Sequence, residues 1–445
     1  MNPYVQYMYS YPHKTAYRPL TGISLKEYAG FLAGGGHDLY LHIPFCERKC
    51  GYCNLFSVTG QGEEDMDRYL DAVERQSRQY REILKPHGTE FEEFTIGGGT
   101  PLLLSERNLE RMFALANTCF SVEKGREIGI ETAPNQTERG KLEILKEARV
   151  TRVSMGIQSF HDEELKTLRR NHGAGQARKA LELLMSMDFP CVNVDFIYGI
   201  PGQTVDSIRA SLKEAVDFGV DEIFLYPLYV RHGAGLIEKG VAPEPEAAYE
   251  QYREMSAFLR SQGFRQDSMR RFVRRSGKDP EKWERSFSEC GFGKSLALGC
   301  GGRSYVGNLH FCTPYHISSQ SCLAQLNKFE GTKDFSAITH GIILSGEEQR
   351  RRYVIRHLLI RPGVRLLRYK ELFGSSVFQD FPLLTEWQEK GFVEVFREAF
   401  LSLTELGMGL SDYLGPMLAS GEINRKMREW EDAYEPAGGS VSGQP

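Results

Sequence analysis

The sequence predicts an α/β fold: a partial barrel of six β/α units, followed by a smaller, mainly helical, winged-helix-like domain. Short apolar segments alternate with amphipathic helical segments from residue 38 to about residue 235. The apolar segments contain few polar alternations, as do parallel strands that are buried on both faces of a sheet. At 445 residues, the chain is also long enough for two or three domains.

The β/α alternation is resolved into individual elements. Strands are predicted at 38–43, 91–96, 127–132, 151–157, 192–197 and 222–228. Helices are predicted at 64–84, 105–116, 136–147, 175–187 and 204–218, with a further helix at 242–259. In barrels of this kind the functional residues gather where the strands end, so the search for a site begins there.

Five regions follow from this pattern. They are an N-terminal arm at 1–37, the partial barrel at 38–235, a barrel extension with a Gly-rich segment at 236–344, a C-terminal domain at 345–430 and a flexible tail at 431–445. In the C-terminal domain RRYVIRHLLI and 383–390 predict helices, and FVEVFREAFLSLTELG predicts two strands and a turn. We favour a packing or lid role for this domain over DNA binding. The arm, with Tyr9, His13, Lys14 and Arg18, either folds over the barrel mouth or forms an ordinary edge segment.

Composition excludes several classes of protein. Hydrophobic residues make up 41% and charged residues 26%, which is typical of a globular protein. The net charge of −4 gives no support to nucleic-acid binding, and no apolar run reaches the roughly 18 residues of a membrane span. The Tyr-rich N-terminus lacks an apolar signal core, so we expect a cytoplasmic protein. Nine cysteines in such a protein favour thiolate chemistry over a disulfide framework.

The most informative segment is LYLHIPFCERKCGYCNLF, which contains Cys46, Cys50 and Cys53 in the spacing C-x3-C-x2-C directly after the first strand. Thiolates are the usual ligands of iron–sulfur clusters. Three thiolates can hold three irons and leave the fourth open, as catalytic metal sites leave one position open. The spacing alone also fits a zinc site completed by His42, or a group of buried thiols.

The motif HIPFCxxxCxYC resembles the cluster loop of radical S-adenosylmethionine (SAM) enzymes, in particular the oxygen-independent coproporphyrinogen III oxidase-like (HemN-like) group, over about residues 36–430. The resemblance implies a [4Fe–4S] cluster on the three cysteines, with one or two SAM molecules as cofactor. It also implies cleavage of SAM to methionine and a 5′-deoxyadenosyl radical, an oxidoreductase or methyltransferase activity, and an electron donor such as flavodoxin or ferredoxin. The cofactor then supplies the difficult chemistry and the protein positions it.

The same resemblance assigns further site residues. In the relatives, the residues matching Gly97, Gly98, Gly99 and Thr100 of FTIGGGTP contact the methionine part of SAM. Those matching Glu131, Gln158, Arg170 and Asp195 hold its carboxylate and ribose hydroxyls, roles that suit an arginine and two carboxylates. Tyr40 and Tyr52 are expected near the cluster and the adenine. Each residue also has an ordinary explanation: a glycine turn, a buried Glu131–Arg170 pair, a loop cap at Asp195, or core packing of the tyrosines.

Two features separate the chain from the best-known relatives. The true decarboxylase carries a fourth cysteine where this chain has Leu55, so we expect a subgroup distinct from that enzyme. The stretch WERSFSECGFGKSLALGCGGRSY lacks the HNxxYW signature of the haem chaperones, and GCGGRSYVG resembles HemN-like tailoring enzymes, including methyltransferases. A tetrapyrrole or a heteroaromatic ring is the expected substrate. A haem-handling chaperone and a coproporphyrinogen III dehydrogenase remain as alternatives.

Two other groups of residues were weighed. Cys290, Cys300, Cys312 and Cys322 are spaced about ten residues apart, which favours buried thiols over a second cluster. Of these, Cys300 is the one expected to face the active site. The run FRQDSMRRFVRR supplies Arg265, Arg270, Arg271, Arg274 and Arg275. It fits either a receptor for substrate carboxylates or a solvated surface strip.

Overall fold

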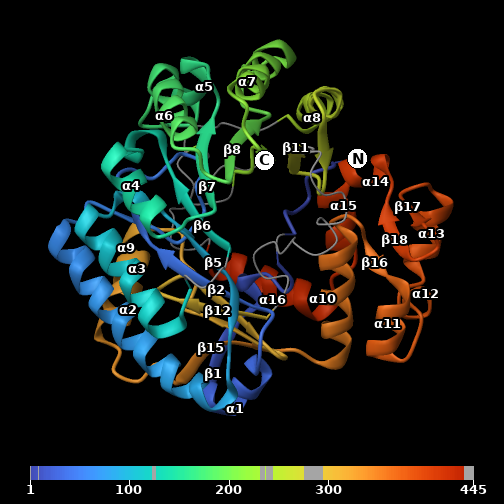
Figure 1. Ribbon diagram of the computed structural model, residues 1–445. Coiled ribbons are helices and arrows are strands. Elements are labelled where there is room, and N and C mark those ends of the chain that lie inside the picture. The colour runs from blue at the N-terminus through green and yellow to red at the C-terminus, as the bar shows by residue number, and fades with distance from the viewer. Residues whose placement is uncertain are drawn as a thin grey trace, which may run out of the picture.

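The computed structural model describes residues 2–8, 10–122, 127–230, 236, 244–274 and 294–434. Within these residues, thirteen strands form one curved sheet in the order β1-β15-β14-β13-β12-β2-β5-β6-β7-β8-β9-β11-β10. Helices cover its outer side, and the C-terminal helices lie beside one edge (Figure 1). The two ends of the strand order, β1 and β10, are not neighbours, so the sheet is a partial barrel.

The six strands predicted for the barrel are present, and they are parallel and adjacent in sequence order. They are β2 (His37–Ile43), β5 (Phe91–Gly98), β6 (Glu127–Thr132), β7 (Arg152–Gln158), β8 (Cys191–Tyr198) and β9 (Glu222–Pro227). Because both faces of these strands are covered, their sequences read as nearly continuous apolar runs. The predicted fold class is confirmed.

Helices that follow these strands in the chain cover the outer face of the sheet, and all but one of them were predicted (Figure 1). They are α2 (Glu63–Leu84), α3 (Glu106–Phe120), α4 (Arg139–Glu147), α5 (Asp162–Thr167), α6 (Ala174–Ser186), α7 (Val205–Phe218) and α8 (Pro245–Ser261). The side chains of Ser105 and Thr204 cap α3 and α7 by accepting from backbone amides. The helix predicted from residue 136 begins later, because η5 (Pro134–Gln136) forms a separate turn first. The short helix α5 was not predicted.

The largest difference from the prediction is the extension of the sheet at both edges. On one edge β12 (Lys294–Leu298) pairs in parallel with β2, and β13 (Arg303–Val306), β14 (Leu309–Cys312), β15 (Ala337–Ile343) and β1 (Arg18–Ser24) follow antiparallel. On the other edge β11 (Arg271–Arg274) and β10 (Phe264–Gln266) follow β9. The sequence predicted only mixed short segments here. The strands of three to five residues, β10 to β14, leave too few positions for a clear alternation.

The C-terminal region is mainly helical, as predicted. It contains α10 (Gly346–Leu358), β16 (Val364–Arg365), α11 (Leu366–Phe373), α12 (Val377–Asp380), α13 (Leu383–Glu389), β17 (Val393–Phe396), β18 (Phe400–Leu403), α14 (Glu405–Gly409), α15 (Ser411–Met417) and α16 (Gly421–Tyr434). A three-stranded sheet in the order β16-β18-β17 includes the predicted hairpin. Helices followed by a small hairpin give the region its winged-helix-like form.

Short elements complete the chain. They are η1 (Lys14–Ala16), α1 (Leu25–Tyr28), η2 (Ala29–Leu32), η3 (Lys85–His87), η4 (Pro101–Leu103), α9 (Ser319–Gly331) and the pair β3 (Phe45–Cys46) and β4 (Val58–Thr59). None of the helices in the described ranges combines the length and the apolar composition needed to cross a membrane.

The N-terminal arm connects the sheet to the C-terminal region. Arg18 Nη2 donates to the carbonyl of Lys426 on α16 at 2.6 Å, and the amide of Ser420 donates to the hydroxyl of Tyr11 at 3.1 Å.

Helix α16 continues past residue 430, where the prediction placed a boundary. The five-part division as a whole stays a prediction. Tyr9, the boundary near residue 235 and the tail beyond residue 434 lie outside the described residues.

Candidate functional site

The three predicted cluster ligands lie on a loop at the carboxyl end of β2. Cys46 ends β3, which pairs in parallel with β4. The amide of Cys53 donates to the carbonyl of Cys50 at 3.2 Å, so the chain turns tightly between them. All three are free thiols with partly exposed side chains. The loop therefore presents its sulfurs where ligands bind in barrels of this kind.

Burial and mutual repulsion favour the neutral form of two of these thiols. Burial, and then the neighbouring Cys53 and Cys50, raise the pKa of Cys46 to about 12. Burial and the charge of Cys50 also raise the pKa of Cys53. Because the thiolates act on one another, their sulfurs lie within electrostatic reach. Three thiolates held this close need positive charge nearby, which bound metal supplies.

Arg170 connects the cysteine loop to the barrel strands. Its Nη1 lies 3.0 Å from Cys50 Sγ and 3.4 Å from the hydroxyl of Tyr52, and its Nη2 donates to the carbonyl of Gly156 at 2.7 Å. The sequence assigned Arg170 to a carboxylate or hydroxyl of SAM, whereas in the structure it first contacts a cysteine. Its Nε is buried and has no hydrogen-bond partner. A buried donor without an acceptor costs free energy, so this N–H suits an anionic ligand.

The glycine-rich end of β5 packs against the cysteine loop. A Cβ on Gly99 would lie 2.4 Å from the carbonyl oxygen of Phe45 and 3.0 Å from Cys46 Sγ. Gly98 has a φ of +121°, and a Cβ there would lie 2.7 Å from the His42 ring. Contact between two parts of the protein therefore already requires both glycines. Their predicted contact with SAM stays a prediction.

Glu131 and Asp195 place two carboxyl groups on the inner side of the sheet. Glu131 Oε2 accepts from the amide of Gly98 at 3.1 Å, and Asp195 Oδ1 accepts from Asn193 Nδ2 at 2.8 Å. Burial raises the pKa of Glu131 to about 7 and the pKa of Asp195 to about 6. Yet Glu131 is exposed and Asp195 is partly exposed, so both reach solvent-accessible space. Water there moderates the pKa shifts, and a ligand that displaces the water has to donate to both carboxyls.

The other residues assigned to SAM lie at the same strand ends. Gln158 ends β7 with a φ of +71°, a backbone state that is rare outside glycine and is concentrated at functional sites. Thr100 Oγ1 lies 4.0 Å from Cys46 Sγ. Gly97 is so close to Glu131 that a Cβ would lie 2.9 Å from its carboxyl carbon. The structure brings these residues together, and their ligand roles stay predictions.

The zinc hypothesis is weakened by the position of His42. Its Nε2 lies 2.9 Å from the carbonyl of Phe56, and its Nδ1 lies 3.2 Å from the hydroxyl of Tyr40. Both ring nitrogens therefore have partners other than a metal, and Tyr40 supports this histidine. Nowhere in the described ranges do three His, Cys, Asp or Glu side chains converge as one bound metal ion requires. A cluster binds each thiolate at a different iron, so it does not require that convergence.

A second apolar cluster, distinct from the main core, lies beside the cysteine loop. Its buried members are Leu168, Ile197, Ile200, Leu228 and Leu236, and Tyr52, Tyr226 and Val230 pack against them. The amide of Gly51 donates to the carbonyl of Leu168 at 3.1 Å and joins the loop to this cluster. An apolar wall beside a few polar groups is typical of ligand pockets. The sequence singled out Tyr52 alone, because scattered aliphatic residues carry no motif.

The four described arginines of the run have hydrogen-bond or ion-pair partners within the protein. Arg270 pairs with Asp412, and Arg271 with Glu222. Arg274 Nε donates to the carbonyl of Val220 at 2.9 Å, and Arg265 pairs with Asp267, which also contacts Arg271. These four side chains thus stabilise the β10–β11 edge and its contact with α15. Arg275 lies outside the described residues.

The remaining cysteines behave as buried thiols. Cys300, Cys312 and Cys322 are buried, and burial raises the pKa of each. Cys300 Sγ lies 3.8 Å from both Thr313 Oγ1 and the carbonyl of Gln325, and the expectation that it faces the active site stays a prediction. Cys312 lines a cavity of about 120 Å³ beside α9, which contains none of the predicted site residues. Cys290 lies outside the described residues.

A parallel partial barrel with three cysteines on the loop after its first strand defines a radical SAM domain. Residues 40–215 match the model of the Radical SAM superfamily. Over these residues the chain contains a radical SAM domain, and it is similar to proteins of the HemN-like group.

Relatives and a solved structure extend the likeness to most of the chain. The chain is 27% identical over 361 residues to the haem chaperone HemW of Bacillus subtilis, covering 80% of this chain and 92% of that protein. It is 26% identical over 416 residues to the oxygen-independent coproporphyrinogen III oxidase of Escherichia coli, covering 88% of each. The solved structure of coproporphyrinogen III oxidase (HemN) from Escherichia coli, described as a radical SAM enzyme, superposes with a TM-score of 0.74 at 22% identity over 96% of this chain and 97% of that one. At 22% identity, the likeness to this solved structure shows a shared fold.

Proposed function

We propose that this chain is an enzyme that holds a [4Fe–4S] cluster on Cys46, Cys50 and Cys53 and cleaves SAM reductively to modify an organic substrate. The observation that carries the proposal is the placement, at the same end of the barrel, of three free thiols on one loop, a guanidinium with a buried N–H that lacks an acceptor, and two carboxyls. Together a cluster and SAM supply a one-electron cleavage that yields a strongly reactive carbon radical.

The residues present fit these cofactors. Three thiolates provide three of the four ligands that a cubane takes. The Nε of Arg170 suits the carboxylate of SAM, because a buried guanidinium N–H gains most from an anionic acceptor. Glu131 and Asp195 suit an ammonium group and ribose hydroxyls, since each carboxyl gains from a donor that replaces water.

The chain's own residues would do three things in such a reaction. Arg170 donates to Cys50 Sγ and so fixes the position of that sulfur beside the barrel strands. Tyr52 and the apolar cluster beside it exclude water from one side of the cysteine loop. Arg170 and the two carboxyls orient the ligand, which reduces the entropy lost on reaching a reactive geometry.

The finer assignment concerns the substrate and its partners. The proposed reaction is hydrogen abstraction or methyl transfer on a tetrapyrrole or a heteroaromatic ring, with one or two SAM molecules and flavodoxin or ferredoxin as electron donor. The support comes from the relatives that act on coproporphyrinogen III or handle haem. Leu55 stands in the place of the decarboxylase's fourth cysteine, which favours a different product. A cytoplasmic location and the absence of nucleic-acid binding belong to the same proposal.

Anaerobic reconstitution tests the proposal. The protein is loaded with iron and sulfide, reduced with dithionite and incubated with SAM. We expect a brown protein with about four irons per chain that releases 5′-deoxyadenosine or S-adenosylhomocysteine. A fully loaded cluster that releases neither product would falsify the catalytic claim.

The similarity to the haem chaperone HemW supports a second candidate function, that of a haem-binding chaperone with the same fold. This function needs a stable haem complex and no SAM turnover. Titration with haem, followed by absorbance, distinguishes the two. A stoichiometric complex together with an inert cluster would favour the chaperone, whereas SAM cleavage without stable haem binding would favour the enzyme.

A further inference from the structure

Glu47 lies directly after the first cysteine, and sequence reasoning gave it no role. Three side-chain amides donate to its Oε2: Asn135 Nδ2, Gln136 Nε2 at 2.9 Å and Asn171 Nδ2 at 3.0 Å. Asn135 and Gln136 lie in the turn that follows β6, and Asn171 directly follows Arg170. One side chain of the cysteine loop therefore contacts two other segments: the turn that follows the strand of Glu131, and the residue next to Arg170.

The chemistry of the acceptor explains why this position carries a carboxylate. All three donors reach one oxygen, Oε2, and the negative charge of an ionised carboxylate lets that oxygen attract several donors at once. An ionised acceptor also makes shorter and stronger hydrogen bonds than a neutral one. The side chain is exposed, so each bond contributes modestly to stability. Three donors from two separate loops nevertheless fix the position of one carboxylate.

The neighbouring contacts show what depends on Glu47. The segment 168–171 holds the cysteine loop at two other points: the amide of Gly51 donates to the carbonyl of Leu168 at 3.1 Å, and Arg170 Nη1 contacts Cys50 Sγ at 3.0 Å. Without the carboxylate of Glu47, both of these contacts would remain. The hydrogen bonds from the loop to the turn after β6, the strand that carries Glu131, would be lost.

We propose that Glu47 is a positioning residue that holds the cysteine loop against the strand ends carrying Glu131 and Arg170, and so sets the affinity of the loaded site for SAM. The inference rests on the proposed function, since it concerns the same cluster and the same SAM molecule. Glu47 acts through the three amides and does not touch the reacting atoms.

The test compares Glu47→Ala, Glu47→Gln, Asn171→Ala and the double variant Glu47→Ala/Asn171→Ala in the reconstituted full chain. Three quantities are measured: iron content, the dissociation constant for SAM, and the EPR spectrum of the reduced cluster with and without SAM. We expect full iron content, with SAM binding weakened about tenfold in Glu47→Ala and less in Glu47→Gln. The double variant binds SAM more tightly than independent losses would predict, because both changes remove the same bond.

Glu138→Ala is the matched control. Glu138 is an exposed carboxylate close to the same turn, and it lies 4.0 Å from Lys141 rather than against the cysteine loop. It should leave the SAM affinity and the EPR spectrum unchanged.

The outcomes separate this inference from the proposed function. If the wild-type protein takes up no iron or cleaves no SAM, the proposed function fails. If the wild type is active and Glu47→Ala keeps its SAM affinity and EPR spectrum, the positioning role is wrong and the function stands. If Glu47→Ala fails to fold or load iron, Glu47→Gln decides, because it keeps the shape of the side chain. Wild-type affinity and spectrum in that variant overturn the inference, and weaker binding at full iron content supports it.

Discussion

Two carboxyl groups between α2 and α3, those of Asp67 and Glu74, and two at the candidate site, those of Glu131 and Asp195, have pKa values shifted in opposite directions. On the outer surface, hydrogen bonds from Arg107 hold the pKa of Asp67 below its usual value. Arg78 and Arg111 do the same for Glu74. Inside the barrel, burial raises the pKa values of Glu131 and Asp195.

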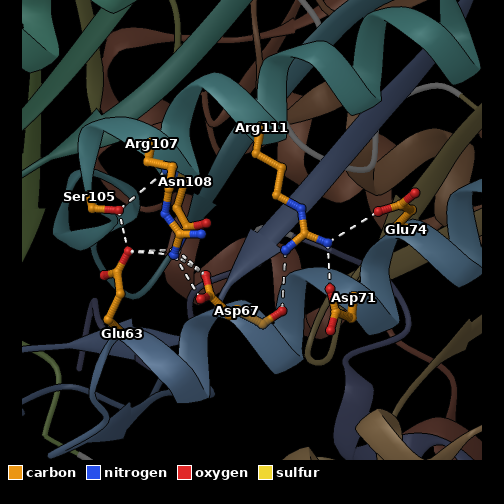
Figure 2. Close-up of polar contacts among 8 residues, drawn as sticks. All are labelled: Glu63, Asp67, Asp71, Glu74, Ser105, Arg107, Asn108 and Arg111. Atoms are coloured by element: carbon orange, nitrogen blue, oxygen red, sulfur yellow. Dashed lines mark hydrogen bonds and ion pairs between the residues drawn. The ribbon is translucent and has the colours of Figure 1, made fainter.

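Figure 2 shows how the outer group is arranged as a ladder of ion pairs between the two helices. Arg107 Nη2 lies 2.7 Å from Asp67 Oδ1 and 3.2 Å from Glu63 Oε1. Arg111 Nη2 lies 3.1 Å from Glu74 Oε2 and also pairs with Asp71. Four carboxylates of α2 thus form ion pairs with arginines of α3.

This contrast distinguishes charged groups that stabilise the fold from charged groups that belong to the candidate site. In the ladder, each arginine has carboxylate partners and water nearby, so the arrangement is complete without a ligand. In the barrel, the carboxyls lie in a setting that disfavours their charge, and the Nε of Arg170 lacks an acceptor. Perturbed groups of this kind are concentrated at functional sites. The barrel interior should therefore control activity, and the ladder should contribute only a little stability.

The largest effect is expected at the cysteine loop. Cys50→Ala should abolish the brown chromophore and SAM cleavage, because two thiolates cannot replace three and Arg170 loses its sulfur partner. Cys322→Ala, a buried thiol on α9, should keep both. Absorbance near the cluster bands and iron content after reconstitution provide the measurement. Equal loss in the two variants would show that the ligands are wrongly assigned.

The next largest effect concerns a buried ion pair outside the candidate site. Arg270 and Asp412 are 5% and 1% exposed, and Asp412 also accepts from the hydroxyl of Tyr229. Asp412→Ala should lower the free energy of unfolding by about 3–5 kcal/mol, because it leaves a buried guanidinium without its partner. Urea unfolding measures this, and Arg270→Met/Asp412→Leu should be less destabilised than the single variant. A loss below about 1 kcal/mol in Asp412→Ala would contradict the buried assignment.

A third prediction concerns Glu222. Its pKa is lowered, like those of the carboxyls in the ladder, but its side chain is buried. Burial opposes the shift, yet Arg152 and Arg271 hold the pKa of Glu222 at about 2, below its usual value of 4.5. The depressed pKa contributes stability that is complete above pH 4.5 and is lost as the pH falls toward 2. This difference corresponds to about 3 kcal/mol. Unfolding measured at several values across this window should show the loss, and Glu222→Gln should show a smaller pH dependence there. Equal pH dependence in the two proteins would remove Glu222 as its source.

The smallest effect is expected in the ladder itself. Arg111→Ala should lower the free energy of unfolding by about 1 kcal/mol or less, because exposed ion pairs are screened by water and salt. The loss should shrink at high salt, and the rate of SAM cleavage should not change. A large loss of SAM cleavage in this variant would contradict the proposal that the ion pairs between α2 and α3 contribute only to stability.

The pattern of apolar residues within short segments was enough to predict the parallel strands of the barrel. The parallel strands β5 to β9 appeared in order, and β2 began within one residue of its predicted start, because buried parallel strands leave continuous apolar runs. The antiparallel strands β12 to β15 were missed. Their pairing is decided by distant partners, such as β1 with β15, and no short window of sequence contains that information.

The candidate site divides in the same way. The cysteines, glycines, Glu131 and Arg170 were found from motifs, and the structure brings them to one end of the sheet. Glu47 and the apolar cluster beside Tyr52 were not found, because their importance lies in contacts between segments that are far apart in the chain.

The sequence by itself determined the fold class, the three thiols and the type of chemistry they support, since these depend on residue type and spacing within short segments. Only the tertiary structure decided that Arg270 and Arg271 pair with internal carboxylates. It also decided that His42 bonds to Phe56 and Tyr40, and that Arg170 contacts a cysteine. The physical reason is that a charge or a hydrogen-bonding group acts on whatever lies within a few ångströms. Folding, and not sequence position, determines that neighbourhood.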